Sequence, residues 1–324
     1  MTPSQAFAGQ NHWGIILQVT GLRLALLVLF AGLFDLQAAK PVVVGYLPHY
    51  RSGIIDKLPV EQFTDIIYFS ISPKADGSLN TASVRPAMLK KLTQRAHAKN
   101  TRVHICVGGW NLSGGFAPMT ANAWARGEFV RNLTVFVRTH KLQGADIDWE
   151  HPKGETEIAN YQKLLIELKR AFVPHRLWLT AAVAGWGRHI KPSTIPFIDR
   201  FHVMAYDQGT PHAPFDGALK DLRNWETQKV PKAKLVLGLP FYGRNAQGTA
   251  ATYAEILQRH RPKPSADLAG GFHFNGPATI RRKTAYALQQ QLAGVMIWEL
   301  GQDAPGNLSL LRLVNQTIAA QPKR

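Results

Sequence analysis

The stretch GADIDWE (residues 144–150) carries an acid at every second position: Asp146, Asp148 and Glu150. Residues i, i+2 and i+4 of a β-strand point to one face, so the three carboxylates share a side. The residues between them, Ile147 and Trp149, are apolar and point to the opposite side. We therefore interpret the stretch as a strand that packs its apolar side against helices and turns its acids into a barrel.

Seven other short, mostly apolar runs alternate with longer amphipathic stretches. The eight predicted strands are residues 42–47, 65–71, 102–108, 144–150, 177–183, 201–207, 234–241 and 294–300. Such nearly continuous apolar runs are typical of parallel strands covered by helices. Apolar residues at 3- and 4-residue steps predict helices over 122–139, 156–172 and 216–228, the last with Asp216 as its N-cap.

This alternation predicts the α/β class and, within it, a (β/α)8 TIM barrel formed by one catalytic domain over residues 40–318, with a tail at 319–324. The alternative is an open doubly wound sheet, but no G-x-G-x-x-G motif follows the first strand. Active sites of such barrels gather at the carboxyl ends of the strands, so the polar residues there are the candidates for function.

Residues 1–39 differ from the rest of the chain. Arg23 precedes the uncharged run LALLVLFAGLF (residues 24–34), and the small-residue stretch Gln37–Ala39 follows it. This layout is typical of a secretory signal cleaved near Ala38 or Ala39. The alternative is an uncleaved anchor, because residues 13–34 are mostly apolar and long enough to span a bilayer. In both cases we expect a secreted or periplasmic domain, in contact with a membrane only if the leader is retained.

The chain carries 38 basic and 21 acidic residues, a net charge of +17. Such a surface attracts polyanions, an anionic cell wall or membrane headgroups, although a charge run is more often simply a solvated face. The sequence contains no zinc-finger spacing and no phosphate-binding glycine loop, so we do not expect a nucleic acid partner.

Neighbouring acids on the strand 144–150 lie about 6–7 Å apart, because a strand rises about 3.3 Å per residue. They cannot all ionise cheaply, and some hold protons at neutral pH. Acid catalysis explains this arrangement best. A divalent cation site is the alternative, but no His or further acid at the neighbouring strand ends completes a ligand shell. An edge strand with its acids in water fits the apolar surroundings poorly.

Aromatic residues stand at several of the other strand ends. They are Tyr46, Trp110 after Gly108 and Gly109, Tyr206 after Met204, and Trp298 after Met296. A flat apolar ring among carboxylates suits the face of a sugar. These residues predict a carbohydrate cleft in preference to a phosphate or nucleotide site.

Residues 143–150, QGADIDWE, resemble the D-G-x-D-x-D-x-E signature of the family 18 glycoside hydrolases, the chitinase family, with Gln143 in place of the first Asp. Four more stretches are similar to motifs of that family: CVGGW at 106–110, MAYD at 204–207, GLPFYGR at 238–244 and GVMIWELGQD at 294–303. The resemblance covers Val42 to about Leu311.

The resemblance implies retaining hydrolysis of β-1,4-linked N-acetylglucosamine, assisted by the acetamido group of the substrate and without metal or cofactor. Glu150 would be the general acid and later the base. Asp148 would hold the acetamido N–H, and Asp146 would share a proton with Asp148. Tyr206 would bind the acetamido oxygen. The other implied substrate contacts are Tyr46, Gly109, Trp110, Met204, Asp207 and Trp298.

The chain departs from the family pattern at Cys106, its single cysteine, which replaces a serine, and at His151, where tyrosine is common. A thiol is the weaker hydrogen-bonding group, so the tuning of Asp146 is expected to differ. The connection between Arg244 and Gly294 looks too short for the α+β insertion of many members. We therefore expect an open, shallow groove.

Three functions follow from these patterns. The first is a chitinase that acts on chitin or its oligosaccharides. The second is hydrolysis of peptidoglycan, whose glycan also contains N-acetylglucosamine and whose anionic wall suits a charge of +17. The third is an inactive chitin-binding lectin, which the retained Glu150 disfavours.

Overall fold

The structure is a computed structural model that describes residues 40–321. The predicted leader at 1–39 and the last three residues of the predicted tail lie outside the described residues. Among residues 40–321, no helix combines the length and the apolar character needed to cross a membrane.

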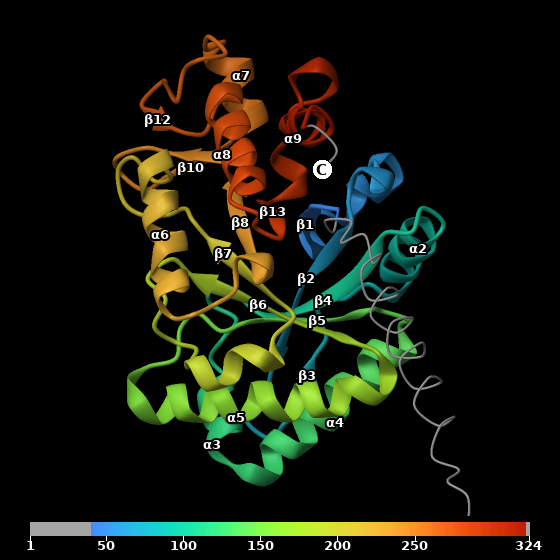
Figure 1. Ribbon diagram of the computed structural model, residues 1–324. Coiled ribbons are helices and arrows are strands. Elements are labelled where there is room, and N and C mark those ends of the chain that lie inside the picture. Colours follow the sequence, from blue (N-terminus) through green and yellow to red (C-terminus); the bar gives the residue numbers. More distant parts are fainter. Residues whose placement is uncertain (1–39, 322–324) are drawn as a thin grey trace, which may run out of the picture. The chain divides into compact units, whose positions relative to one another are not determined.

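Eight parallel strands form a closed barrel, as predicted (Figure 1). Around the barrel the order is β1-β13-β8-β7-β6-β5-β4-β2, and pairing of β1 with β2 closes it. The strands are β1 (Val42–Pro48), β2 (Asp65–Pro73), β4 (Arg102–Gly108), β5 (Gly144–Asp148), β6 (Trp178–Ala184), β7 (Arg200–Met204), β8 (Leu235–Pro240) and β13 (Gly294–Trp298). A short strand, β3 (Leu79–Asn80), pairs antiparallel with the end of β2.

Helices cover the outside of the barrel (Figure 1). They are α2 (Pro86–His97), α3 (Phe116–Ala121), α4 (Ala123–Thr139), α5 (Gly154–Phe172), α6 (Phe215–Thr227), α8 (Pro277–Gln289) and α9 (Leu310–Ala319). After β1 and β6 the chain forms the 3-10 helices η1 (His49–Lys57) and η4 (Pro192–Phe197) instead. The three helices predicted from periodicity are confirmed as α4, α5 and α6.

The predicted N-cap at Asp216 was wrong. Helix α6 starts at Phe215 with Pro214 as its N-cap, and Asp216 lies in the first turn. In that position its negative charge interacts favourably with the positive end of the helix dipole. The sequence pattern cannot distinguish such a residue from an N-cap. In α4, by contrast, the side chain of Asn122 caps the helix by accepting from the backbone N–H groups of Trp124 and Ala125.

Three of the predicted strands end early by two residues or more. β5 stops at Asp148, β7 at Met204 and β13 at Trp298, which are two, three and two residues before the predicted ends at 150, 207 and 300. The apolar pattern continues past the last ladder hydrogen bonds, so it overestimates the strands. As a result, Glu150 and Asp207 lie on loops at the carboxyl end of the barrel.

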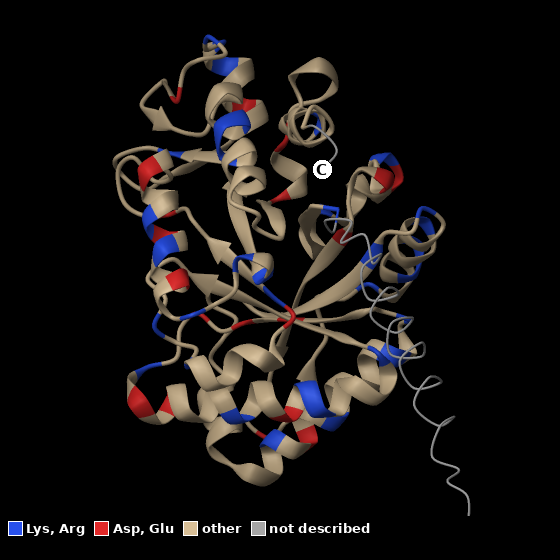
Figure 2. Ribbon diagram, in the orientation of Figure 1, with Lys and Arg blue, Asp and Glu red and all other residues tan. Residues whose placement is uncertain are grey.

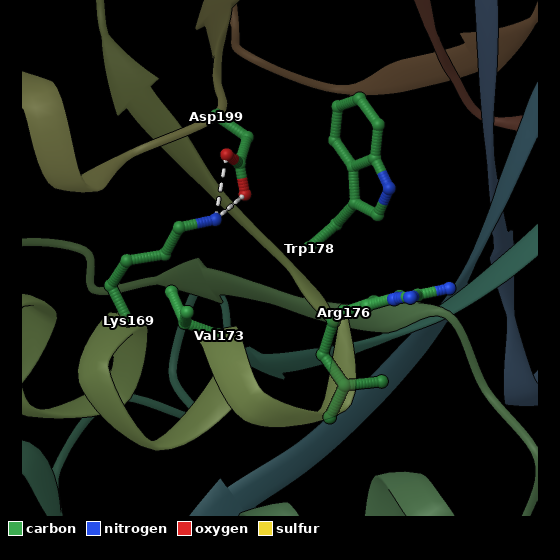
Figure 3. Close-up of a pocket in the computed structure, with 6 residues that line it drawn as sticks. Lys169, Val173, Arg176, Trp178 and Asp199 are labelled. Atoms are coloured by element: carbon green, nitrogen blue, oxygen red, sulfur yellow. Dashed lines mark hydrogen bonds and ion pairs between the residues drawn. The ribbon is translucent and has the colours of Figure 1, made fainter.

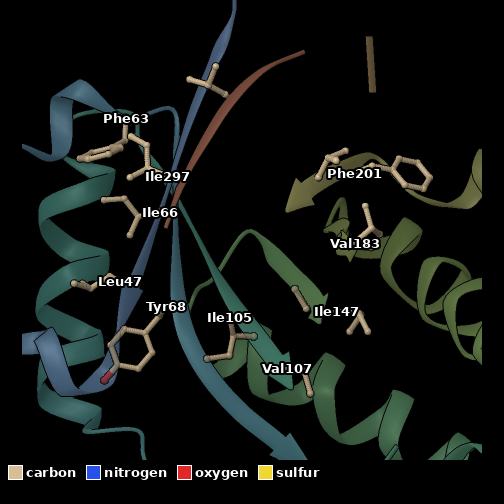
Figure 4. Packing of buried hydrophobic residues seen from close by; sticks show 14 of the residues in the cluster. Leu47, Phe63, Ile66, Tyr68, Ile105, Val107, Ile147, Val183, Phe201 and Ile297 are labelled. Carbon is tan, nitrogen blue, oxygen red and sulfur yellow. The ribbon is translucent and has the colours of Figure 1, made fainter. Parts of the chain in front are cut away.

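The main core lies between the strands and the helices (Figure 4). Ile147 and Trp149 belong to it, which confirms that the apolar residues of GADIDWE face outward. The Trp149 ring stacks on Phe116 of α3 at 5.1 Å and meets Tyr161 of α5 edge-on at 5.3 Å. These contacts fix the outer side of β5 and leave its acids inside.

The amino end of the barrel is closed by an ion cluster. Asp65 accepts two hydrogen bonds from Arg102, at 2.6 and 2.8 Å, and one from Arg200 at 2.9 Å. The guanidinium groups of Arg102 and Arg200 lie 4.7 and 4.5 Å from the ring of Trp178. This end is therefore filled by charge pairs, and the chemistry is left to the opposite end.

The expectation that the chain lacks an α+β insertion was wrong. After β8 it forms a four-stranded antiparallel sheet and one helix: β9 (Tyr242–Arg244), β10 (Ala250–Thr252), α7 (Tyr253–His260), β11 (Leu268–Ala269) and β12 (Phe272–His273). Strands of two or three residues are too short to show a period-2 pattern, so the sequence did not reveal them. The insertion is small, and the expected shallow groove stays a prediction.

Candidate active site

Asp146 and Asp148 are buried on β5, and Glu150 follows on the loop with 15% of its side chain exposed. The structure therefore brings the three acids together at the carboxyl end of the barrel, as predicted. It also gives each acid a different environment.

Asp146 is surrounded by hydrogen-bond donors. Its carboxylate accepts from the hydroxyl of Tyr46 at 2.7 Å and from that of Thr180 at 2.5 Å, and Nδ1 of His202 lies 3.1 Å away. Burial favours the neutral acid, but His202, Thr180 and Tyr46 together outweigh it and lower the pKa of Asp146. Asp146 is the ionised member of the row.

Asp148 has the opposite character. Burial, followed by the negative charges of Glu150 and Asp146, raises its pKa well above the usual value. Its Oδ1 is buried and has no hydrogen-bond partner among the described residues. Asp148 therefore holds its proton to a higher pH than Asp146 does, and its Oδ1 is free to accept from a ligand.

Burial and the nearby charge of Asp207 raise the pKa of Glu150 to about 7, against the opposing effect of the Trp110 backbone. A carboxyl group with this pKa can both donate and accept a proton at neutral pH. Ser113 positions the loop, since its Oγ accepts from the Glu150 N–H at 3.0 Å and donates to the Asp148 carbonyl at 3.1 Å. Nε2 of His151 lies 3.8 Å from Glu150 Oε2.

Cys106 lies directly beside the acids. It is fully buried on β4 and is the ladder partner of Asp146 on β5. Burial, followed by the charges of Asp148 and Asp146, raises the pKa of the thiol well above its usual value. The thiol therefore stays neutral beside Asp146, whose other partners are the hydroxyls of Tyr46 and Thr180 and Nδ1 of His202.

Tyr206 and Asp207 approach the acids from the loop after β7. The Tyr206 hydroxyl lies 3.9 Å from Sδ of Met296, and burial, then Tyr242 and Asp148, raise the pKa of this phenol. Asp207 forms a hydrogen bond of 3.1 Å with Nη2 of Arg244. Burial opposes ionisation of Asp207, but its partners, His212 and Arg244, lower its pKa below the usual range.

Aromatic rings line the same end of the barrel. Trp298 lies 5.7 Å from Tyr46 and meets the ring of Phe69 edge-on at 4.8 Å. Met204 packs against the interior cluster with Trp298, whereas Trp110 is 69% exposed. The predicted aromatic surface is thus a half-buried floor at Trp298 and an exposed ring at Trp110.

Gly109 joins β4 to this site. Its φ is +108°, a conformation that side chains rarely adopt, and its N–H donates to the Asp148 carbonyl at 2.7 Å. A Cβ at this position would lie 2.4 Å from Cζ of Phe69. Only glycine lets the loop pass between the acids and the aromatic floor.

Sequence reasoning missed several partners in the site: Phe69, Ser113, Thr180, His202 and Arg244. Thr180 and His202 could have been found by the rule that located the acids, because each is a polar residue at an inward position of an apolar strand. Phe69 and Ser113 carry no comparable signal, since aromatic and serine residues are common in cores and loops. In the described part of the chain, no three His, Cys, Asp or Glu side chains are grouped so that they could hold a metal ion.

Comparison with known proteins places this geometry in a family. The model of the glycosyl hydrolases family 18 matches residues 42–303. "Probable chitinase 2" of Drosophila melanogaster is 30% identical in an alignment 304 residues long, which covers 71% of this chain and 63% of that protein. The chain thus spans less than two thirds of the length of this relative.

Two solved structures are similar over most of the chain. The GH18 chitinase ChiB of Flavobacterium johnsoniae has 28% identity and a TM-score of 0.78, covering 86% of this chain and 94% of its own. A chitinase of Bacteroides thetaiotaomicron has 27% identity and a TM-score of 0.79, covering 86% and 97%. The family model covers most of the chain, and the barrel and the row of acids are consistent with that match. The chain belongs to the glycosyl hydrolases of family 18.

Proposed function

We propose that this protein is a retaining glycoside hydrolase that cleaves β-1,4-linked N-acetylglucosamine polymers, chitin or its oligosaccharides. Membership of family 18 and the similarity to proteins named as chitinases support the substrate class. The observation that carries the proposal is the graded row of acids, in which the pKa of Asp146 is lowered, that of Asp148 is raised and that of Glu150 is about 7.

In the proposed first step, Glu150 donates its proton to the glycosidic oxygen as the bond to the anomeric carbon breaks. The acetamido oxygen of the same sugar attacks that carbon and forms an oxazolinium ion, so no protein nucleophile is required. Glu150, now a carboxylate, takes a proton from water, which attacks the anomeric carbon and reopens the ring. Two inversions at one carbon leave its configuration unchanged.

The other residues hold the acetamido group. The free Oδ1 of Asp148 is the proposed acceptor for its N–H, and positive charge on the oxazolinium ion favours ionisation of Asp148. The Tyr206 phenol, kept protonated by its raised pKa, is the proposed donor to the acetamido oxygen. Trp298 is the proposed floor beneath the sugar, and Asp207 and Trp110 are proposed contacts at the mouth of the site.

Proton NMR of the first products tests the stereochemistry. The protein is incubated with N-acetyl-chitotetraose, and the anomeric signals are followed before mutarotation. Retention predicts that the β-anomer appears first. Early appearance of the α-anomer would contradict the proposal while leaving chitin hydrolysis intact.

Peptidoglycan is the second candidate substrate, and the net charge of +17 is the observation that favours it. Release of sugar from purified sacculi and from colloidal chitin separates the two. Faster release from chitin supports the first candidate, and release from sacculi alone supports the second.

A protein named as an agglutinin has a similar fold. A chitinase-like agglutinin of Robinia pseudoacacia matches with a TM-score of 0.76 at 24% identity, so the fold alone does not separate an enzyme from a lectin. The presence of Glu150 with a pKa suited to proton transfer supports an enzyme. On the composition of residues 1–39, we propose that the domain acts outside the cytoplasm, secreted or periplasmic.

A further inference from the structure

Basic residues line the amino end of the barrel, around the ion cluster of Asp65 with Arg102 and Arg200. Seven connections lead from a helix into the next barrel strand at this end, and two of them, 63–65 and 290–294, carry no Lys or Arg. The other five are 98–102, 140–144, 173–178, 198–200 and 228–235. They contain eight cations and one acid, Asp199; the cations are Lys99, Arg102, Lys141, Arg176, Arg200, Lys229, Lys232 and Lys234. We call this surface the basic face.

The connections are neighbours in space. The N–H of Gln143 donates to the carbonyl of Val103, and that of Trp178 donates to the carbonyl of Gln143, each at 2.8 Å. Asp199 continues the series, with its N–H 2.8 Å from the carbonyl of Leu179. The connections therefore follow one another along the rim of the barrel. Lys and Arg residues also stand on helices and loops elsewhere in the chain (Figure 2).

Four cations of the basic face are exposed and unpaired. Lys99, Lys141, Arg176 and Lys229 are exposed, and none of them forms a salt bridge within residues 40–321. The single acid does not neutralise them, because both oxygens of Asp199 are held by Lys169 at 2.6–2.7 Å.

Three of these cations occupy backbone positions that normally favour glycine. The φ angles of Lys141, Arg176 and Lys229 are +56°, +54° and +68°, and each residue lies just beyond a helix C-terminus. Glycine or asparagine adopts this conformation at lower cost. The helix dipole explains a preference for positive charge within the last turn. The helix dipole does not explain why neighbouring connections all expose cations that have no ion-pair partner.

An apolar spot lies within the basic face. Val173 is 60% exposed beside a pocket of about 200 Å³ that Lys169, Arg176, Leu177, Trp178 and Asp199 also line. Figure 3 shows Lys169 reaching Asp199 while the Arg176 side chain extends away from that pair. An exposed valine and a tryptophan edge among cations match a membrane interface, where apolar and charged groups meet.

We propose that the basic face docks on a membrane rich in anionic phospholipids, with the acids of β5 directed away from it. The sequence supports a membrane over a soluble polyanion, because β1 starts at this end of the barrel and the leader with its apolar run, residues 24–34, directly precedes it in the chain. This proposal does not depend on the substrate of the active site.

Vesicle flotation tests the proposal with the full chain. The measured quantity is the binding ratio, which is the partition coefficient for phosphatidylglycerol–phosphatidylcholine vesicles divided by the partition coefficient for pure phosphatidylcholine vesicles. The leader balances one Arg with one Asp and adds little to this ratio. In the variant K141N/R176N/K229N, asparagine keeps the backbone conformation and removes three charges. Each cation near an anionic leaflet is worth about a factor of five, so the ratio is expected to fall by about 100-fold.

The matched control is K74N/R261N/K263N, which removes three exposed cations from connections at the other end of the barrel. Its ratio is expected to stay within twofold of the wild-type ratio, and both variants are expected to retain the circular dichroism of the parent. Equal losses in the two variants would overturn the proposal, as would a wild-type ratio near one. Binding to an isolated anionic wall polymer without a preference for anionic vesicles would also overturn it.

Salt gives a second test that needs no variant. The wild-type ratio is expected to fall steeply between 50 and 500 mM NaCl, because the Debye length shortens from about 14 Å to about 4 Å over this range and the attraction between exposed charges is screened. A ratio above one that does not change with salt would contradict docking through the basic face.

Discussion

The hydroxyl of Tyr46 on β1 donates a 2.7 Å hydrogen bond to Oδ2 of Asp146 on β5, across the inside of the barrel. The same hydroxyl lies 2.9 Å from Nδ1 of His202 on β7. One phenol thus connects three strands at the base of the row of acids. By holding Asp146 ionised, it helps to leave the proton of the row on Asp148.

Tyr46→Phe removes this donor. Because a hydrogen bond to a charged group contributes about 1.5–3 kcal/mol, the pKa of Asp146 is expected to rise by about one unit or more. The acid limb of the pH profile of kcat/KM should therefore shift to higher pH. The control is Tyr68→Phe, whose buried hydroxyl has no partner among residues 40–321, and its profile should match the parent. An acid limb that stays in place in Tyr46→Phe would show that the hydrogen bond does not tune the row.

Asp207→Asn tests the electrostatic control of Glu150. Activity requires protonated Glu150 and is lost as pH rises through its pKa of about 7. The Asp207 charge helps to raise that pKa, so its removal should move the basic limb of kcat/KM to lower pH. The exposed acid Asp216 provides the control, and Asp216→Asn should leave the limb in place. A shift to higher pH in Asp207→Asn would contradict the assignment of Glu150 as the acid.

Gly109→Ala tests the close approach of the β4 loop. A Cβ at this position would lie 2.4 Å from the Phe69 ring on a backbone with φ of +108°. We expect a loss of about 1–3 kcal/mol in the free energy of unfolding and a lower kcat. In the same loop, a Cβ at Gly114 meets no atom within 4 Å. Urea unfolding of Gly114→Ala should match the parent, and equal losses in the two variants would refute the steric explanation.

Asp65→Asn tests the ion cluster at the amino end. Arg102, His104 and Arg200 hold the pKa of the buried Asp65 well below its usual range despite the opposing effect of burial. Removal of one partner from such a cluster costs about 3–5 kcal/mol, which urea unfolding at pH 7 measures. Because the pKa of Asp65 is depressed in the folded state, its carboxylate contributes its full stabilisation above the unfolded-state pKa of about 3.9. This contribution decreases as the pH falls further. The difference between variant and parent should therefore shrink below about pH 4.

The exposed pair of Asp56 and Lys91 is the control for this cluster. Asp56→Asn should leave the urea midpoint unchanged, because exposed ion pairs are solvated and screened. A similar loss in both variants would mean that the effect is a general one of charge and not a property of the buried cluster.

The sequence predicted the barrel and the row of acids because both follow from the alternation of side chains in a strand. Ile147 and Trp149 could only face the helices if Asp146 and Asp148 faced inward. The same rule overextended β5, β7 and β13, since apolar residues continue past the last ladder hydrogen bond. The strands of the insertion were missed because two or three residues are too few to show the alternation of apolar and polar side chains.

The division of labour among the acids could not be predicted. It depends on contacts between distant strands, in which Tyr46, Thr180 and His202 meet Asp146 while Oδ1 of Asp148 is left without a partner. Cys106 shows the same limit, because the sequence marks the departure from serine but not the groups that surround Asp146. In the structure they are the hydroxyls of Tyr46 and Thr180 and the imidazole of His202, with Cys106 on the neighbouring strand.

Glu150→Gln tests the central claim most directly. Glutamine keeps the shape of the side chain but cannot donate a carboxylic proton, and general acid–base catalysis contributes about 10²–10⁴-fold. Turnover of N-acetyl-chitotetraose and its binding by calorimetry are measured on Glu150→Gln and on the control Glu155→Gln, an exposed acid of α5. We predict that Glu150→Gln loses at least about 100-fold in kcat, the lower end of that range, with its affinity for the sugar kept, while the control is unaffected. Turnover by Glu150→Gln at the parental rate would contradict the account.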